Sequence, residues 1–214
     1  MTHCFSRRSF LKGSAAAAAV LSSPLLPADA AFSETENGLF SPVSALCQTQ
    51  YGPVKGREGE NGLLCWYGIP YGAAPTGESR WTAPQEPACW LTVRDCTSPA
   101  PAAYQYTTFP LGTEDCLTLD IYSSVEAKKR PVLVYLHGSA ATGSSLELPG
   151  CELVRDAGCV FVALNYRLGL FGWNCLPALT ADPDSTGNFA LLDIARALDW
   201  VRDNIRRFGG DADN

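Results

Sequence analysis

The sequence predicts an α/β domain whose mixed sheet begins with antiparallel strands. Two short, continuous apolar runs, "PVLVYLH" (131–137) and "CVFVALNY" (159–166), are typical of strands buried on both faces. A helical pattern lies between them, and a longer one follows the second run. The order strand, helix, strand, helix indicates an α/β sheet, and shorter strand-like runs upstream indicate its antiparallel part.

The upstream half of the chain alternates short apolar runs with turns. Residues 46–51 and 63–67 flank "GREGENG", in which Asn61-Gly62 is a strong hairpin-turn dipeptide. Residues 68–110 are rich in Pro, Gly and aromatics without a period, so we expect irregular structure there. Residues 117–122 alternate apolar and polar side chains, which predicts a strand.

Two helices are expected in the downstream half. The first covers 146–157 and ends at Gly158. The second covers 188–208, with Asn188 as a plausible N-cap and Gly209-Gly210 as its stop. Its apolar residues recur at helical spacing and predict one buried face: Leu191, Ile194, Leu198, Val201, Ile205 and Phe208.

The composition limits the class of protein. Hydrophobic residues make up 46% of the 214 positions and charged residues 18%, which indicates a globular chain with a real core. The net charge of −6 argues against nucleic acid as a partner.

Residues 1–30 have the features of a bacterial export signal. "SRRSFLK" precedes an alanine-rich run, and Ala28-Asp29-Ala30 offers a cleavage site. This order resembles the twin-arginine type, an address read by the twin-arginine export machinery; the alternative is an amphipathic helix with two solvated arginines. The apolar run is too short to span a bilayer, so no permanent membrane anchor is expected. We expect a polar joint over 31–45 and the folded domain over 46–214, exported across the bacterial cytoplasmic membrane to the periplasm or beyond.

The cysteines suggest disulfide bonds. Of nine cysteines, eight follow the predicted signal, and an even number in an exported chain favours disulfides. No C-x-x-C pair occurs, and the only histidine after the signal is His137, so neither a metal site nor a cofactor is expected.

A loop of small residues follows the first buried strand. "HGSAATGSS" lets the backbone approach a ligand closely, and free N–H groups at a strand end can hold a developing oxyanion. Taken alone, the segment could equally be an ordinary strand-to-loop turn.

Five motifs in one order carry a resemblance to a known family. They are "GIPYGAAPTGESRW", "TEDCLTLDIY", "VLVYLHGSA", "ALNYRLGLFGW" and "TGNFALLDIARALDWVRDNIRRFGGDADN". In this order the chain, from about residue 50 to 214, resembles the type-B carboxylesterases, the family of the cholinesterases and bacterial para-nitrobenzyl esterases. The resemblance implies the N-terminal part of an α/β-hydrolase fold, incomplete here.

The resemblance implies that the catalytic triad lies outside this chain. In the family the "FGGD" segment leads into one more strand and a G-E-S-A-G elbow that carries the nucleophilic serine. The sequence ends at Asn214, which we expect to lie just before that elbow. His137 matches the histidine of the family's H-G-G-G motif, so we expect it to position the loop rather than act as the triad base.

The resemblance implies that this chain contains the family's oxyanion hole. Gly138, Ser139 and Ala140 match the three loop positions, and the backbone N–H groups of Ser139 and Ala140 match the donors. Ser139 replaces a glycine, which would strain the loop if that position needs a positive φ. Ala141 replaces the usual aromatic residue, and the loop is about one residue short.

The resemblance also implies structural contacts. Arg80 with Glu114, and Arg167 with Asp193, match two ion pairs of the family. Cys116 matches one end of the family's first disulfide, and Cys96 is the nearest upstream candidate for its partner, with another pairing or free thiols as alternatives.

These inferences combine into one functional expectation. The chain is expected to be part of an exported serine hydrolase that cleaves a small-molecule carboxylic ester through an acyl-serine intermediate. The alternatives are a non-catalytic binding or adhesion member of the same fold, and a truncated reading frame without function.

Overall fold

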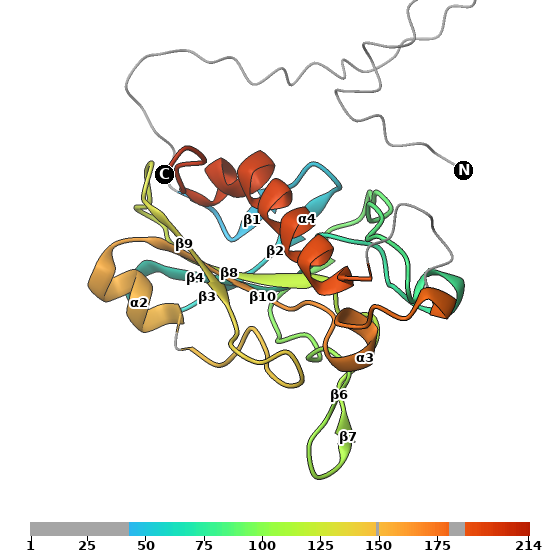
Figure 1. The fold of residues 1–214 in the computed structure, drawn as a ribbon. Helices are drawn as coiled ribbons and strands as arrows, with labels where there is room; N and C mark the ends of the chain where they lie inside the picture. Colours follow the sequence, from blue (N-terminus) through green and yellow to red (C-terminus); the bar gives the residue numbers. More distant parts are fainter. Residues whose placement is uncertain (1–42, 149, 180–186) are drawn as a thin grey trace, which may run out of the picture. The chain divides into compact units, whose positions relative to one another are not determined.

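The computed structural model describes residues 43–148, 150–179 and 187–214, and the predicted signal and most of the predicted joint lie outside these ranges. The described residues form one compact unit built around a mixed five-stranded sheet of order β3-β4-β8-β10-β9 (Figure 1). Its strands are β3 (Arg57–Glu58), β4 (Leu63–Pro70), β8 (Thr118–Ser124), β10 (Val160–Leu164) and β9 (Val132–Leu136).

The sheet is antiparallel from β3 to β10 and parallel between β10 and β9. The predicted strands at 131–137 and 159–166 are therefore neighbours, and helix α2 (Gly150–Ala157) forms the crossover between them. The Asn61-Gly62 turn joins β3 to β4, with both residues at positive φ. The strand predicted at 46–51 does not join this sheet but belongs to a separate, smaller one.

The described residues also form two smaller sheets. β1 (Leu46–Gln48), β2 (Pro53–Lys55) and β5 (Arg94–Asp95) form a three-stranded sheet, and β6 (Gln105–Tyr106) pairs with β7 (Pro110–Leu111). Besides α2 and the long helix at 189–204, the described residues form only short helices: η1 (Glu60–Gly62), η2 (Gly77–Ser79), α3 (Gly169–Gly172), η3 (Pro177–Leu179) and η4 (Ile205–Phe208). The predicted irregular stretch thus contains only short elements.

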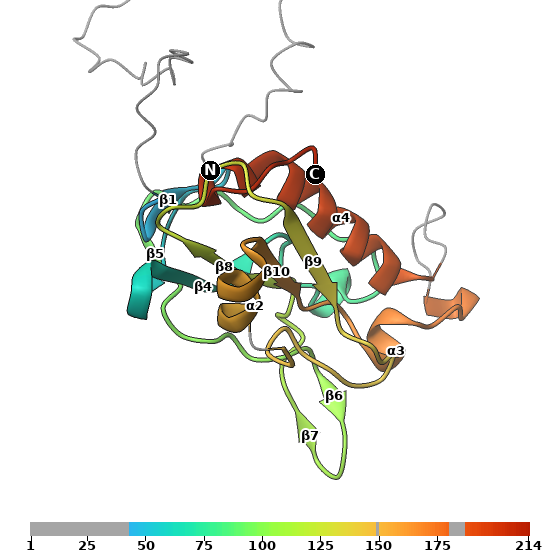
Figure 2. The same cartoon turned by 90° about the vertical axis from the view of Figure 1, so that its left-hand side faces the viewer.

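Alternating side chains give the main sheet two cores. Trp66, Ile121 and Val162 pack with helix α4 (Phe189–Asn204), whereas their neighbours Cys65 and Phe161 pack with α2 on the other face. Figure 2 shows the sheet in side view with the two helices. β10 is buried along its whole length, as predicted.

The prediction that residues 131–137 are buried on both faces was wrong. β9 is the edge strand of the sheet within the described chain, and Leu133 and Leu136 are 48% and 42% exposed. An apolar run shows only that its side chains are hydrophobic. Whether they are buried depends on the elements that pack beside the strand, and the run contains no information about those.

The predicted buried face of the long helix was also partly wrong. Leu191 and Leu198 are exposed, and the inner face carries Asp193 and Asn204 instead. Both polar residues have partners inside the fold, so a pattern that counts only apolar residues misses them. Asn188 occupies the N-cap position without a side-chain capping bond, and Gly209 ends η4 in the left-handed conformation.

Candidate functional site

The candidate loop begins at the carboxyl end of β9, where His137 is fixed by Tyr166. The two rings stack with centroids 4.1 Å apart and planes 9° apart. The Tyr166 hydroxyl donates a 2.5 Å hydrogen bond to the His137 carbonyl. Burial lowers the pKa of His137, which favours the neutral imidazole. The start of the loop is therefore held by a packed aromatic pair.

The middle of the loop is ordered by the Ser139 hydroxyl. Its oxygen accepts hydrogen bonds from the N–H groups of Ala141 (3.1 Å) and Thr142 (3.2 Å). The Ala140 carbonyl accepts a 2.8 Å bond from the Gly169 N–H at the start of α3. Within the described residues, the N–H groups of Ser139 and Ala140 donate to no protein acceptor. The fold itself therefore makes no use of these two donors.

Ser139, which the resemblance matches to a glycine, does not adopt a positive φ. Among the described non-glycine residues, positive φ occurs only at Asn61 and Lys129. The left-handed conformation that would penalise Ser139 is therefore not adopted.

The second half of the loop is tied to the β6 strand and to the His137 ring. The Gly143 N–H donates to Gln105 Oε1 (3.0 Å), and Gln105 Nε2 donates to the Gly143 carbonyl (2.8 Å). A Cβ at Gly143 would lie 2.4 Å from His137 Nδ1, closer than any side chain tolerates. Glycine at this position lets the loop close against the histidine.

A buried carboxylate anchors the end of the loop to the sheet. Asp120 on β8 accepts a 2.6 Å bond from the Ser145 hydroxyl and a 2.8 Å bond from the Gly68 N–H. Asn165 completes the network by accepting from the Ser145 N–H (2.9 Å) and donating to its hydroxyl (3.0 Å). Burial raises the pKa of Asp120, while the two donated bonds act in the opposite direction.

Sequence reasoning missed this network. Asp120 stands within an alternating strand, at a position whose immediate neighbours on either side are apolar. A carboxylate between apolar residues of a predicted strand is a signal that could have suggested a buried, hydrogen-bonded role.

Arg167 and Asp193 form a buried, bidentate ion pair. Arg167 Nε lies 2.8 Å from Asp193 Oδ2, and Nη2 lies 2.7 Å from Oδ1. The remaining Nη1 donates to the carbonyls of Arg80 (3.0 Å) and Thr82 (2.9 Å). Burial raises the pKa of Asp193, and the Arg167 guanidinium opposes that shift by favouring the carboxylate. The pair joins α4 to the segment that follows β10.

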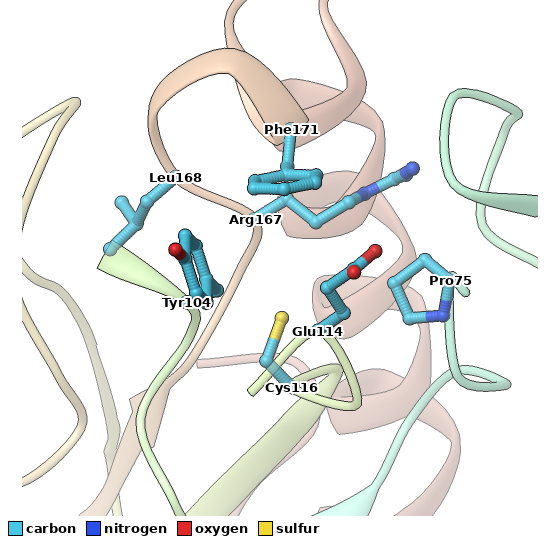
Figure 3. A pocket seen from close by; sticks show the side chains of 7 residues that line it. All are labelled: Pro75, Tyr104, Glu114, Cys116, Arg167, Leu168 and Phe171. Atoms are coloured by element: carbon cyan, nitrogen blue, oxygen red, sulfur yellow. The ribbon is translucent and has the colours of Figure 1, made fainter. Parts of the chain in front are cut away.

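The second predicted ion pair is more exposed. Arg80 Nε lies 2.5 Å from Glu114 Oε2, and Nη2 lies 2.9 Å from Oε1. Figure 3 shows Glu114 beside a small pocket whose lining also includes Tyr104, Cys116 and Phe171. The pocket has a volume of about 10 Å³, room for roughly one water molecule. No residue of the 138–140 loop lines it.

The proposed Cys96–Cys116 disulfide was wrong. Both residues are buried free thiols in different surroundings. The Cys96 backbone pairs with Lys55 and Tyr67, whereas Cys116 lies beside the Arg167–Asp193 pair.

The described residues contain no candidate for two other kinds of site. Among the described residues, no group of three or more His, Cys, Asp or Glu side chains could hold a metal ion. The same residues include no helix long and apolar enough to cross a membrane.

Comparison with known proteins decides the family. The family model described as "Carboxylesterase family" matches residues 43–214. The chain belongs to the carboxylesterase family. This match begins three residues before residue 46, the predicted start of the domain.

Relatives and solved structures in the carboxylesterase family agree with that assignment. The para-nitrobenzyl esterase of Bacillus subtilis is 41% identical over 178 residues, which cover 78% of this chain and 36% of that protein. The fumonisin B1 esterase of Sphingopyxis macrogoltabida is 37% identical over 176 residues, covering 76% of this chain and 32% of that protein. A solved para-nitrobenzyl esterase structure superposes with a TM-score of 0.71 at 40% identity, over 78% of this chain and 36% of its own. The chain thus spans about a third of the length of these relatives.

The fold and the export route are settled by the same comparisons. The likeness to the solved esterases confirms the N-terminal part of an α/β-hydrolase fold. Residues 4–23 match the twin-arginine translocation signal, so the protein is exported across the cytoplasmic membrane.

Proposed function

We propose that the complete protein is an exported esterase that cleaves carboxylic esters through an acyl-serine intermediate, with this segment supplying the oxyanion hole. The observation that carries the proposal is the pair of unused N–H groups at Ser139 and Ala140, in a loop at the carboxyl end of β9. Membership of the carboxylesterase family supports the reaction class.

The loop suits this role because it is ordered before any substrate arrives. Its start is held by Tyr166, its middle by Gly169, and its end by Gln105 and Asp120. Donors that are already oriented need no reorganisation when the carbonyl oxygen becomes an anion, which is the source of their catalytic effect.

The nucleophile and its base are proposed to come from sequence that follows residue 214 in the complete protein. A triad base must contact both a serine and an acid. His137 is the only histidine after the signal, and within the described residues neither of its ring nitrogens has a hydrogen-bond partner. It is also stacked on Tyr166. We therefore assign it to positioning the loop, and we expect the 31–214 segment alone to be inactive.

The proposed substrate is a small-molecule carboxylic ester, and the proposed export partner is the twin-arginine machinery. The alternative is a non-catalytic binding member of the same fold. Ser139 adopts no positive φ, so this residue gives no structural reason against the esterase.

The experiment compares the complete gene product with the 31–214 segment on para-nitrophenyl acetate and butyrate. We expect the complete protein to release nitrophenol and to be labelled covalently by a fluorophosphonate, and the segment to do neither. An unlabelled, inactive complete protein that is folded would support the binding alternative. Hydrolysis by the segment would show that the nucleophile lies within these residues.

A further inference from the structure

Two cysteines far apart in the sequence touch each other between the sheet and helix α2. Cys65 lies on β4 and Cys151 lies in the first turn of α2, 86 positions later, and their Sγ atoms are 3.4 Å apart. Both are free thiols. Cys65 is 2% exposed, whereas Cys151 is partly exposed. The contact therefore has one buried sulfur and one that solvent can reach.

The surroundings of the pair are apolar and aromatic. Tyr67, Tyr122 and Phe161 form the same core cluster as Cys65, with Cys151 packed against it. Arg57 is the nearest cation: its guanidinium lies over the Tyr67 ring at 5.7 Å. Burial raises the pKa of the Cys65 thiol to about 12, and the neighbouring Cys151 adds to the effect. Cys65 is thus protonated and unreactive by itself at neutral pH.

We propose that Cys65 and Cys151 are a redox pair that is oxidised to an intrachain disulfide after export, fastening α2 to β4. The twin-arginine signal sends the protein out of the reducing cytoplasm, and disulfides persist in the compartments beyond. A disulfide has a sulfur–sulfur length of about 2.05 Å, so the two sulfurs need to approach by only about 1.4 Å. The partly exposed Cys151 can make that movement by rotating its side chain.

The oxidant is an external disulfide, carried by a thiol–disulfide oxidoreductase or a small molecule. The Cys151 thiolate attacks it, forming a mixed disulfide and releasing one external thiolate. Cys65 then loses its proton, attacks the Cys151 sulfur and releases the second external thiolate. Two protein thiols are oxidised, and one external disulfide is reduced to two thiols. Burial keeps the Cys65 thiolate scarce, so the attack begins at the partly exposed Cys151.

The bond would link positions that are widely separated along the chain. Cross-links that close long loops restrict the unfolded chain most, so this one stabilises the folded state. Helix α2 follows the candidate loop along the chain. The cross-link would therefore also fix the helix to which the end of that loop is connected.

The test uses the complete protein purified after export, with free thiols blocked by iodoacetamide at harvest. We expect Cys65 and Cys151 to escape alkylation and to appear in one linked peptide that separates on reduction. Dithiothreitol is expected to lower the melting temperature by roughly 5–10 °C. In Cys151→Ser, which keeps the fold because its position is partly exposed, the reductant effect should become clearly smaller.

The matched control is Cys175→Ser, which removes an exposed thiol and should retain the full reductant effect. Quantitative alkylation of both Cys65 and Cys151, persisting after incubation with oxidised glutathione, would overturn the proposal. A linked peptide that joins either residue to a different cysteine would overturn it as well.

Discussion

Arg167 and Asp193 form the most deeply buried ion pair of the described chain, at 2% and 0% side-chain exposure with a shortest separation of 2.7 Å. The pair also connects elements: Asp193 belongs to α4, and Arg167 reaches the carbonyls of Arg80 and Thr82 in the irregular segment. Four acceptor oxygens from three residues thus surround one guanidinium, which is why a full charge is tolerated here.

Removing one member of this pair should be strongly destabilising. In the complete protein we expect Asp193→Ala to lower the free energy of unfolding by roughly 3–5 kcal/mol, because Arg167 would remain buried without a counter-charge. Urea unfolding measures the loss. The control is Asp199→Ala, which removes an exposed partner of Arg202 on the same helix and should cost far less. Equal losses in the two variants would contradict a structural role for the buried pair.

The oxyanion role of the loop is tested by removing a single N–H group. In the complete enzyme, Ala140→Pro should lower kcat by roughly 10²–10³. Ala140→Ser keeps the N–H group at an exposed position, so its kcat should stay close to that of the unmodified enzyme. The ester assay decides, with circular dichroism to confirm the fold. Unchanged kcat in the proline variant would remove the assigned role.

The Asp120 anchor predicts a pH-dependent difference between two variants. Burial raises the folded-state pKa of Asp120 above its unfolded value of about 3.9, so its contribution to stability is greatest at low pH and is lost as pH rises through the folded pKa. Asp120→Asn does not titrate. The stability of the Asn variant relative to the unmodified protein should therefore increase between pH 4 and pH 7. Urea unfolding at both values measures this, and a difference that falls as pH rises would mean that burial does not dominate at this site.

The export signal depends on its paired arginines. Arg7 and Arg8 lie within the residues that match the twin-arginine signal. Replacing both with lysine should leave the product in the cytoplasm, because the machinery reads arginines rather than positive charge. Cell fractionation with immunoblotting measures the distribution, and Lys12→Arg serves as a charge-preserving control. Normal export of the double variant would exclude this route.

The exposed edge of β9 predicts that the 31–214 segment aggregates when expressed alone. The Val132 N–H is bonded to the Asn214 carbonyl, but after Val132 no described strand pairs with the outer edge of β9. This edge and the exposed side chains of Leu133 and Leu136 form an apolar surface that can pair with other chains. Leu133→Lys should make the segment more soluble yet destabilise the complete protein, in which we expect that edge to be covered. Size-exclusion chromatography and thermal unfolding measure the two effects. A monodisperse, cooperatively unfolding segment would contradict the expectation.

Local patterns in the sequence determined much of the fold. The β-branched runs indicated β9 and β10, the Asn61-Gly62 dipeptide indicated the turn before β4, and the glycines marked the helix ends. These signals succeed because each depends on the conformational preference of a few adjacent residues. The ordered motifs also identified the family, and with it the partners Arg80–Glu114 and Arg167–Asp193, which lie at hydrogen-bonding distance.

The tertiary structure alone decided which surfaces are covered and which distant residues meet. β9 could not be recognised as an edge strand from its own residues, because its burial depends on a neighbour. The inner face of α4 includes Asp193 and Asn204 because partners from elsewhere neutralise their polarity. The Asp120–Ser145 anchor and the Cys65–Cys151 contact likewise join segments that are remote in sequence. Such contacts are fixed by the packing of whole elements, and periodicity carries no information about them.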